Sequence, residues 1–509
     1  MRLRSVCRLN WARLSHSYAT RPPLAIPYKT GQPMHETRPH YLPEPGFLTP
    51  GITALEYYDR RMRLAKDLPI RSAVIVAGNN VVHSSGSVFY HFQQDTDLYY
   101  LTGWLEPDSV AVIEKVADNK NDDDVVFHML VPPKNPATEL WEGARTGLEG
   151  AYDYFNADEV VEINRIDAYL KGIVKRNDHI YFDSKSKGAK LSKFGNFFSL
   201  GYHRQSDSID EMLRGKSVKS LKLVLAQHRA IKSPAEIKVM HKAGQISSRA
   251  FNTAMAQVSL EPFVTEKLLA KYLEYAFVRG GCDREAYIPV VASGPNALTI
   301  HYTRNDDILY KDETVFVDAG GKLGGYCADI SRTWPNSPNG FSDPQRDIYT
   351  AVLNTNRICI DQCNENYGMS LHDVHELSVT TLLLELRSLP GFSNLSRSDV
   401  SRELFPHYIG HHLGLDLHDT PSVSRFGRLR KGNVVTIEPG IYVPYNDKWP
   451  KHYQGIGVRV EDDIVVGSTP SDILNLTSLC AKEVADVELL VRLGATTPGL
   501  YDEAVQISI

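Results

Sequence analysis

The chain contains 509 residues, of which 42% are hydrophobic and 23% are charged, and its formal net charge is −5. That length exceeds what one ordinary hydrophobic core serves, so we expect two domains. The charge balance gives no electrostatic basis for binding nucleic acid, and no run of about 18 apolar residues predicts a transmembrane helix.

Residues 1–36 differ from the rest of the chain. Arginines recur between Arg2 and Arg21 among several Ser and Thr, and the first acidic residue is Glu36. A short basic amphipathic segment without an unbroken apolar core is typical of a mitochondrial transit peptide. We therefore predict a location in the mitochondrial matrix or on the matrix face of the inner membrane, with peripheral membrane association. A disordered basic tail without a targeting role is the alternative.

A linker and an α/β domain are predicted next. Residues 37–56 are rich in Pro and Gly and are expected to form the linker, and residues 57–215 the domain. Hydrophobic periodicity predicts helices at 57–68 and 160–174, and buried strands at 72–78, 110–116, 125–131 and 179–183. This part contains no His, Cys or carboxylate cluster at ligand spacing, so we expect no chemistry of its own from it.

Residues 216–500 are expected to form the second domain. After the strand-like residues 221–227, Ser233 to Glu236 predict a helix start, because Ser caps well, Pro suits the first turn and Glu closes a capping box. The pattern then predicts helices with strands and hairpins between them: 234–258, 265–279, 343–365 and 371–389. The expected fold class is α/β, or α+β.

Two acidic residues lie in the glycine-rich hairpin TVFVDAGGKLGGYCADISRTW. If its turn centres on Leu323 and Gly324, Asp318 lies opposite Asp329, with Cβ atoms about 5 Å apart. Carboxylates that close repel each other unless they are protonated or neutralised by cations, so the pattern favours a metal site. Acids on an exposed surface hairpin are the alternative.

Two further strand-like segments place acids among β-branched residues. NVVTIEPGIYV contains Glu438, and GIGVRVEDDIVV contains Glu461 and Asp463. An unpaired charge buried among such residues would cost several kcal/mol of folding free energy. Strand alternation places Arg459, Glu461 and Asp463 on one face, so periodicity does not choose between Glu461 and Asp463.

The segment HYIGHHLGLDLHD brings four histidines together: His407, His411, His412 and His418. On a helix, the spacing of four residues would stack His407 and His411 on one face. Four carboxylates and one imidazole, without Cys, suit Mn²⁺, Co²⁺, Fe²⁺ or Zn²⁺. Two such ions that share carboxylates can activate a bridging hydroxide and polarise a carbonyl, so the set predicts hydrolysis rather than redox chemistry.

On these motifs, residues from about 230 to 487 resemble the pita-bread metallopeptidases and, within them, the aminopeptidase P family. The segment AVIVAGNNVVHSSGSVFYHFQQDTDLYYLTGWLEPDSVAVI resembles the N-terminal domain of that family. The resemblance is strongest to its mitochondrial members, the Xaa-Pro aminopeptidase 3 and fungal intermediate cleaving peptidase group. It implies a catalytic domain of pseudo-symmetric antiparallel sheet and helices, with two divalent metal ions, expected to be Mn²⁺.

The resemblance also implies a role for each ligand. Asp318 would bind one metal alone, Asp329 and Glu461 would bridge both, and His411 and Glu438 would complete the other site. This selects Glu461 over the aspartate two residues further on.

Further roles around the metals follow from the same resemblance. Glu438 would also act as a proton shuttle, while His301 and His418 would position the scissile carbonyl and stabilise the tetrahedral intermediate. Four residues match positions in and around the substrate pocket: His407, Tyr442, Tyr287 and Arg459.

The implied activity is that of a metal-dependent aminopeptidase. It would remove one N-terminal residue from peptides or from imported proteins after presequence cleavage, and so change the stability of the mature protein. After His418 and Asp419 the chain reads TPSVSRFG, where bacterial relatives have a Val-Gly sequence, so a strict need for proline is in doubt. Homo-oligomers are common in the family.

Other readings of the sequence stay open. A proline dipeptidase of the same fold would need a basic residue for the free C-terminus of its substrate. A methionine aminopeptidase fits poorly with the large N-terminal domain. A binding module of this fold is the alternative outside enzymes, although all five ligands are retained.

Overall fold

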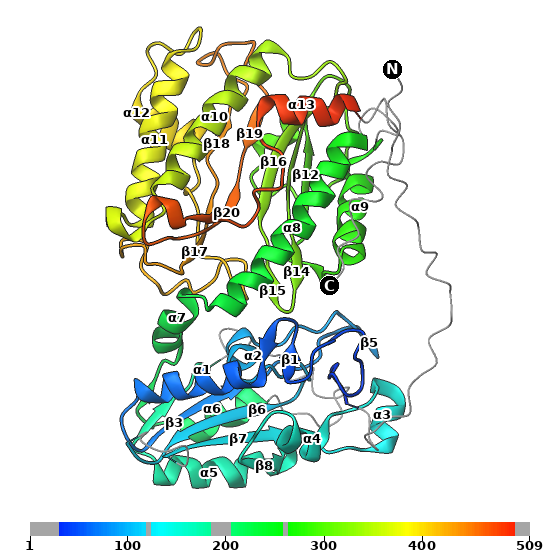
Figure 1. Ribbon diagram of the computed structural model, residues 1–509, viewed down its shortest axis with the longest axis vertical. Helices are drawn as coiled ribbons and strands as arrows, with labels where there is room; N and C mark the ends of the chain where they lie inside the picture. The colour runs from blue at the N-terminus through cyan, green and yellow to red at the C-terminus, as the bar shows by residue number, and fades with distance from the viewer. Residues whose placement is uncertain (1–29, 119–123, 185–204, 258–262, 494–509) are drawn as a thin grey trace, which may run out of the picture.

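The computed structural model describes residues 30–118, 124–184, 205–257 and 263–493. The chain forms two parts, and α7 (Lys222–Ala230) lies between them (Figure 1). Within these residues, no helix combines the length and the apolar character needed to cross a membrane.

A six-stranded mixed sheet forms the centre of the N-terminal domain, in the order β10-β9-β3-β6-β7-β8. Its strands are, in chain order: β3 (Ser72–Ala77), β6 (Val110–Lys115), β7 (Val125–Val131), β8 (Glu159–Glu162), β9 (His179–Tyr181) and β10 (Val218–Lys219). Strands β3, β6 and β7 pair antiparallel, whereas β8, β9 and β10 each join in parallel. The central strands are buried on both faces, as their runs of β-branched residues predict.

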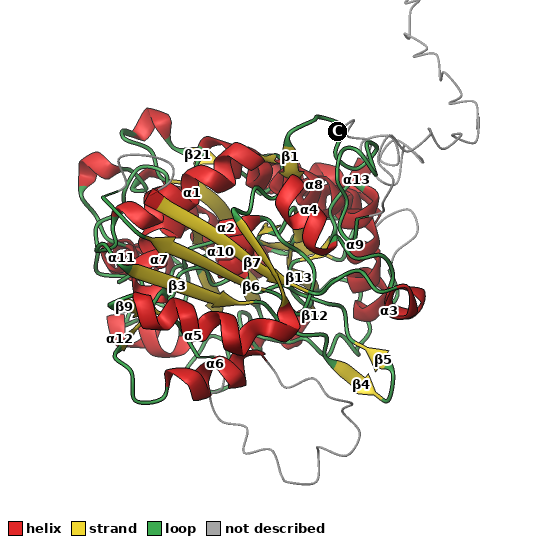
Figure 2. Cartoon of the chain, turned by 90° about the horizontal axis from the view of Figure 1, so that it is seen from below, coloured by secondary structure: helices red, strands yellow, loops and turns green. Residues whose placement is uncertain are grey.

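Helices cover both faces of this sheet (Figure 2). On one face, α1 (Ala54–Lys66) and α2 (Thr96–Thr102) pack on side chains such as Val74 and Ile113. On the other face, α5 (Ile166–Arg176) and α6 (Gln205–Leu213) pack on alternate residues such as Ile75. Small elements complete the domain: β1 (Phe47–Thr49), β2 (Ile52–Thr53), β4 (His83–Ser85), β5 (Val88–Phe89), α3 (Pro136–Glu142), α4 (Gly147–Asp153) and a 3₁₀ turn (Ile163–Arg165).

Several expected boundaries in this half differ from the structure. Residues 160–162, predicted as helix, are strand β8, and the sheet continues to Lys219, past the expected domain end at 215. Within the predicted transit peptide, Gln32 and Met34 are buried against the domain, and Leu105 donates its main-chain N–H to Gln32. At least residues 30–36 therefore belong to the folded part. Residues 1–29 lie outside the described residues.

The strand predicted at residues 221–227 is wrong, because this segment lies in helix α7. Leu221 and Leu225 are buried while Leu223 is 63% exposed, which is the helical rather than the alternating pattern. The helix start at Ser233 is confirmed. Ser233 and Glu236 exchange the two hydrogen bonds of a capping box at 2.8 and 3.2 Å.

Helices enclose the sheets of the C-terminal domain (Figure 1). The long helices are α8 (Pro234–Gln257), α9 (Glu266–Arg279), α10 (Asp343–Asp361), α11 (Leu371–Arg387) and α13 (Val484–Leu493). Short turns of helix lie between them: 3₁₀ turns at Gly294–Leu298, Glu365–Tyr367 and Pro470–Asp472, α12 (Arg397–Asp399) and a π turn at Val400–Leu404.

Antiparallel strands supply the rest of this domain. The first half has β11 (Arg284–Glu285), β12 (Val290–Ser293), β13 (Thr314–Ala319), β14 (Gly321–Leu323), β15 (Tyr326–Cys327) and β16 (Ile330–Pro335). The second half has β17 (Val434–Ile437), β18 (Gly440–Tyr442), β19 (Gly457–Arg459), β20 (Asp462–Val465) and β21 (Leu474–Asn475). The predicted acidic ligands lie in or next to two pairs of antiparallel strands. One pair, β13 and β16, belongs to the sheet β12-β13-β16, and the other, β17 and β20, belongs to the sheet β17-β20-β21.

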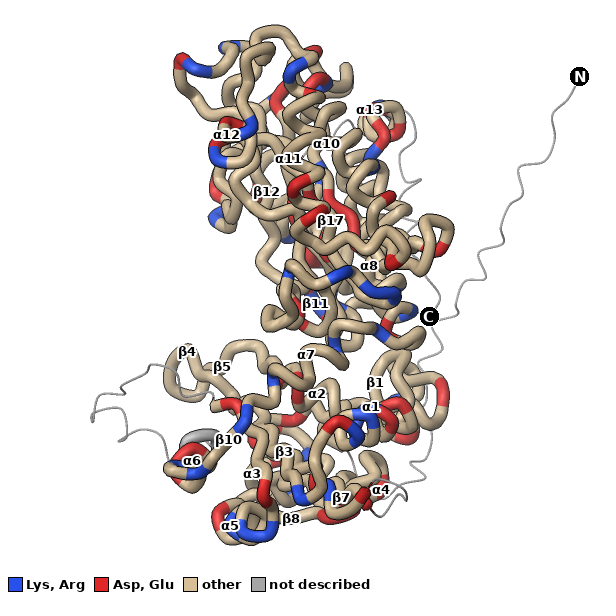
Figure 3. Tube along the Cα trace, turned by 90° about the vertical axis from the view of Figure 1, so that its left-hand side faces the viewer, with Lys and Arg blue, Asp and Glu red and all other residues tan. Residues whose placement is uncertain are grey.

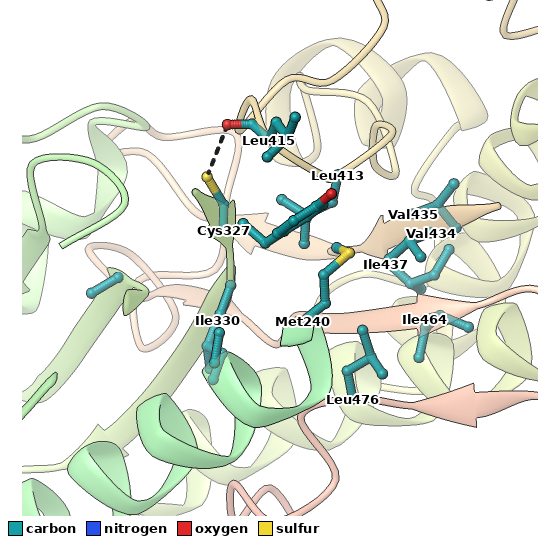
Figure 4. Packing of buried hydrophobic residues seen from close by; sticks show 14 of the residues in the cluster. Met240, Cys327, Ile330, Leu413, Leu415, Val434, Val435, Ile437, Ile464 and Leu476 are labelled. Atoms are coloured by element: carbon teal, nitrogen blue, oxygen red, sulfur yellow. Dashed lines mark hydrogen bonds between the residues drawn. The ribbon is translucent and has the colours of Figure 1, made fainter. Parts of the chain in front are cut away.

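Apolar side chains from both halves of this domain share one core (Figure 4). Met240 of α8 lies between the two sets of strands, and the Cys327 thiol contacts the Leu415 carbonyl oxygen at 3.8 Å. The labelled neighbours in this cluster are Ile330, Leu413, Val434, Val435, Ile437, Ile464 and Leu476. This packing fixes the first hairpin, the histidine segment and the second pair of strands relative to one another.

Candidate metal centre

The five predicted ligands occur where strands of the C-terminal domain end or are interrupted. Asp318 lies in β13, and Asp329 occupies the break between β15 and β16. Glu438 follows β17 directly, and Glu461 lies in the break between β19 and β20. Acidic positions accordingly gather beside β17 in the interior of the domain (Figure 3). An interrupted strand frees a side chain from the strict alternation of a regular one.

The first hairpin does not have the predicted register. Its turn centres between Gly324 and Gly325, so Asp318 lies opposite Ser331 and not opposite Asp329. At Gly320, an added Cβ would lie 1.8 Å from the Ala328 carbonyl oxygen, so the chain here requires glycine. This close approach accompanies the break that turns Asp329 toward the site.

The prediction that a helix stacks His407 and His411 is also wrong. Residues 406–419 contain no helix, and residues 409–413 instead run beside β17. Thr436 donates its main-chain N–H to the His411 carbonyl at 2.9 Å, and Glu438 donates to the Ile409 carbonyl at 2.8 Å. This pairing places the His411 side chain next to Glu438.

The structure brings the side chains of all five predicted ligands together. Ligand atoms of Asp329, His411 and Glu461 all lie within 4.8 Å of one another. His411 Nε2 is 3.5 Å from Asp329 Oδ2 and 3.8 Å from Glu438 Oε1. The Tyr287 hydroxyl contacts Asp318 Oδ1 at 2.5 Å and also contacts Asp329 Oδ1, which joins Asp318 to the group.

The electrostatics of this group favour bound cations. Burial raises the pKa of Asp318 and Glu461, and it raises the pKa of Glu438 to about 7. The pKa of Asp329 is lowered, because the hydrogen bond and charge of His411 outweigh its burial. Two of the four carboxylates, Asp329 and Glu461, are buried, and the only cationic groups that the described residues set against the four are His411 and Arg459, so ionisation of all four requires further positive charge. Oxygen and imidazole donors of this kind fit divalent Mn²⁺, Co²⁺, Fe²⁺ or Zn²⁺.

Arg459 connects this acidic group to the predicted substrate pocket. Its side chain is buried and donates to Asp318 Oδ2, to Ser331 Oγ at 2.9 Å and to the Tyr442 hydroxyl at 2.8 Å. The Tyr442 hydroxyl in turn lies 2.9 Å from His407 Nε2. His407 Nδ1 donates to the Tyr408 carbonyl, and the Tyr442 hydroxyl, which accepts from Arg459, has its own proton free to donate to Nε2.

His407 is therefore a neutral imidazole. Burial and the charge of Arg459 lower its pKa to about 3, in agreement with this hydrogen-bond pattern. The Glu438 carboxylate lies 3.7 Å from the same ring, so one carboxyl group faces both His411 and the predicted pocket.

The two outer histidines lie at the solvent side of the group. His418 and His301 are both exposed, and the His418 ring centroid is 4.3 Å from that of His411. Burial, together with charges that include those of His411 and His301, lowers the pKa of His418. The charge of His301 also contributes, after burial and the charge of Arg459, to the lowered pKa of His407.

Sequence reasoning missed residues that hold the ligands in place. Ser331 Oγ donates to Glu461 Oε2 at 2.6 Å, and Asp463 Oδ2 accepts the main-chain N–H of Asp329 at 3.0 Å. The sequence pattern presents Asp463 only as an alternative ligand to Glu461. Sequence reasoning did not identify Ser331, because the predicted turn centre at Leu323 and Gly324 placed Asp329 opposite Asp318.

Two family descriptions match this sequence. Metallopeptidase family M24 matches residues 238–468, and the aminopeptidase P N-terminal domain matches residues 57–181. The first range includes all five converging ligands.

Several known proteins are similar to this chain over almost its whole length. Intermediate cleaving peptidase 55 of Saccharomyces cerevisiae is 49% identical over 485 residues, which cover 95% of this chain and 92% of that protein. Xaa-Pro aminopeptidase 3 of Homo sapiens is 34% identical, with 90% of each chain covered. The mitochondrial intermediate cleaving peptidase 55 of Arabidopsis thaliana is 34% identical, with 91% of this chain and 87% of that protein covered.

The fold is similar as well. The crystal structure of the Saccharomyces cerevisiae protein, lacking 58 N-terminal residues, superposes with a TM-score of 0.79 at 48% identity. The superposition covers 88% of this chain and 100% of the solved chain.

Proposed function

Because this chain belongs to metallopeptidase family M24 and carries the N-terminal domain of aminopeptidase P, we propose that it trims imported mitochondrial proteins. It is a metal-dependent aminopeptidase. It removes one N-terminal residue from a protein whose presequence has already been cleaved, and it does so in the matrix. Its native ions are a pair of Mn²⁺.

One observation carries this proposal. The ligand atoms of Asp329, His411 and Glu461 lie within 4.8 Å of one another, and Asp318 and Glu438 adjoin them through Tyr287 and His411. The five residues come from four separate chain segments and converge on one group of carboxylate and imidazole donors. Two divalent ions held there supply a water of lowered pKa and polarise the scissile carbonyl.

The residues around this centre divide the remaining work. Glu438 faces both His411 and His407, so its carboxyl group can take a proton from the reacting water and carry it to the leaving amine. His301 and His418 face the site from the solvent side, where their N–H groups can donate to the carbonyl oxygen as it becomes negative.

The pocket beyond the scissile bond is built from His407 and Tyr442. Arg459 and His407 both bond the Tyr442 hydroxyl, which fixes this wall of the pocket. The segment after Asp419 reads TPSVSRFG, where bacterial relatives have a Val-Gly sequence, so a strict need for proline in the second substrate residue is not expected. The loop after Asp419 runs to helix α11, where His372 donates its main-chain N–H to the Arg425 carbonyl at 2.9 Å.

Peptide cleavage tests this proposal and separates it from proline dipeptidase activity. The purified protein with Mn²⁺ is given three substrates: a decapeptide beginning Tyr-Ser, the same peptide beginning Tyr-Pro, and the dipeptide Tyr-Pro. We expect both decapeptides to lose one residue and the dipeptide to react poorly. Cleavage of the dipeptide alone would identify a proline dipeptidase. Mass spectrometry of mitochondrial N-termini with and without the protein then identifies the native substrates.

A further inference from the structure

Arg229 joins the two domains through a buried cluster of charges. It lies at the end of α7, and its side chain is 7% exposed. One guanidinium nitrogen, Nη1, donates to Asp97 Oδ1 at 2.6 Å and to Thr96 Oγ1 at 3.1 Å, both in α2 of the N-terminal domain. The other, Nη2, donates to Asp416 Oδ2 at 2.8 Å and to Asp419 Oδ1 at 2.6 Å in the catalytic domain.

Asp419 is the best-held acid of this cluster. Its side chain is 1% exposed, and its second oxygen accepts from Lys232 Nζ at 2.9 Å. Its main-chain N–H donates to the His412 carbonyl at 2.8 Å, which closes the loop of residues 412–419. An added Cβ at Gly414 would lie 2.6 Å from Asp419 Oδ2, so the loop is packed directly on this carboxylate.

His418 precedes Asp419 and depends on it for its position. The His418 ring is exposed, and no group among the described residues forms a hydrogen bond to it. Its placement beside His411, at 4.3 Å between ring centroids, therefore follows from its backbone. The backbone at His418 is held in place because Arg229 and Lys232 bind the carboxylate of the next residue, Asp419. A buried carboxylate that loses one of two cationic partners moves toward solvent or takes up a proton.

We propose that Arg229 is a positioning residue for His418, and that the N-terminal domain thereby contributes to turnover through α2. This inference rests on the proposed function, in which His418 acts on the substrate carbonyl. Arg229 does not touch the substrate. It holds Asp419 from one side and Asp97 from the other, so its loss releases the His418 loop without removing a metal ligand.

The guanidinium geometry makes this role specific to arginine. Arg229 contacts four oxygens on two domains with two nitrogens, and a lysine ammonium reaches fewer of them from a single point. Arg229→Lys is therefore expected to restore only part of the function that Arg229→Met removes.

Steady-state kinetics of the full-length protein with saturating Mn²⁺ test this proposal. We expect Arg229→Met to lower kcat about 10- to 100-fold, with KM changed less than about threefold and bound metal unchanged. Asp97→Asn, which removes only the partner in the N-terminal domain, is expected to lower kcat by a smaller factor. The matched control is Arg61→Met, since Arg61 is another buried arginine that holds α2, through the Leu101 carbonyl, but bonds no described residue of the loop 412–419. It is expected to leave kcat unchanged.

A double mutant separates this inference from the proposed function. If Arg229 acts through His418, then Arg229→Met has little further effect on kcat in a His418→Ala background. An equal loss of kcat in both backgrounds, or the same loss in Arg61→Met, would overturn the positioning role and leave the proposed function standing. If His418→Ala itself retained full kcat, the role of His418 in the proposed function would fail, and the inference with it.

Discussion

The main-chain N–H of Asp329 donates a hydrogen bond of 3.0 Å to Oδ2 of Asp463. This bond crosses from the break in the first hairpin to strand β20 of the second pair. Asp463 is buried, so it supports the ligand from behind while Glu461 faces the other ligands. Glu461 and Asp463 lie two residues apart and thus have different roles.

Replacing Asp463 tests this supporting role. Asp463→Ala leaves the Asp329 N–H buried without its acceptor, so we expect the metal affinity to fall about 10- to 100-fold. Activity should return when the metal concentration is raised. A titration of activity with Mn²⁺ measures the shift, and Asp463→Asn, which keeps an acceptor oxygen, is the matched control. An unchanged titration curve for Asp463→Ala would show that this bond does not support Asp329.

Asp329→Ala is expected to abolish hydrolysis and leave the fold largely intact. The carboxylate contacts both His411 and Tyr287, and Asp329 is one of the two acids expected to touch both ions. The lowered pKa of Asp329 shows that His411 stabilises its ionised form, so the melting temperature of the metal-free variant should fall modestly while the fold is retained. Activity and thermal unfolding are measured together. Near-normal turnover with saturating Mn²⁺ would contradict the assignment of Asp329 as a shared ligand.

His418→Ala is expected to lower kcat by about 100-fold, since the loss of one donor to a developing oxyanion costs that much in other enzymes. Metal content should stay at the wild-type value, because His418 lies outside the converging ligand group. Elemental analysis beside kinetics distinguishes the two roles. Loss of metal in proportion to activity would identify His418 as a ligand instead.

Glu114 gives the stability of the N-terminal domain a dependence on pH. Burial disfavours its ionised form, but hydrogen bonds from His128, Arg176 and Asn177 outweigh this and lower its pKa from 4.5 to about 2. The contribution to the free energy of unfolding is therefore complete above about pH 4.5 and is lost as the pH falls through about 2.

The variant Glu114→Gln lacks this titration. Its stability should fall less than that of the wild type between pH 6 and pH 3, by a difference of roughly 2 kcal/mol. Thermal unfolding of both metal-free proteins across that range measures it. Ligand protonation affects both proteins equally, so parallel curves would exclude the proposed role of the Glu114 pKa.

Much of the fold could be predicted from local pattern. The strands at 72–78, 110–116 and 125–131 are confirmed because runs of β-branched residues mark strands that are buried on both faces. The helix beginning at Ser233 is confirmed because its capping box is a local signal. The strand predicted at residues 221–227 is wrong because Leu221, Leu223 and Leu225 fit both an alternating and a helical pattern over so short a span.

The residues of the site could be predicted, but their geometry could not. Acids set among apolar residues marked the positions of Asp318 and Glu438, whereas the family resemblance and not the pattern chose Glu461 over Asp463. The register of the first hairpin follows from its turn at Gly324 and Gly325, one residue beyond the centre that the sequence predicted. The path of His411 depends on its pairing with β17, a tertiary contact that leaves no periodic signal. The same holds for Arg229, whose partner Asp419 is 190 residues away along the chain.

The anomalous scattering of crystals grown with Mn²⁺ tests the central claim most directly. The proposed centre predicts two strong peaks, both within bonding distance of Asp329 and Glu461, with Asp318 on one ion and His411 and Glu438 on the other. A map without peaks among these five side chains, or with Mn²⁺ bound only elsewhere on the chain, would contradict the assignment of the dinuclear site.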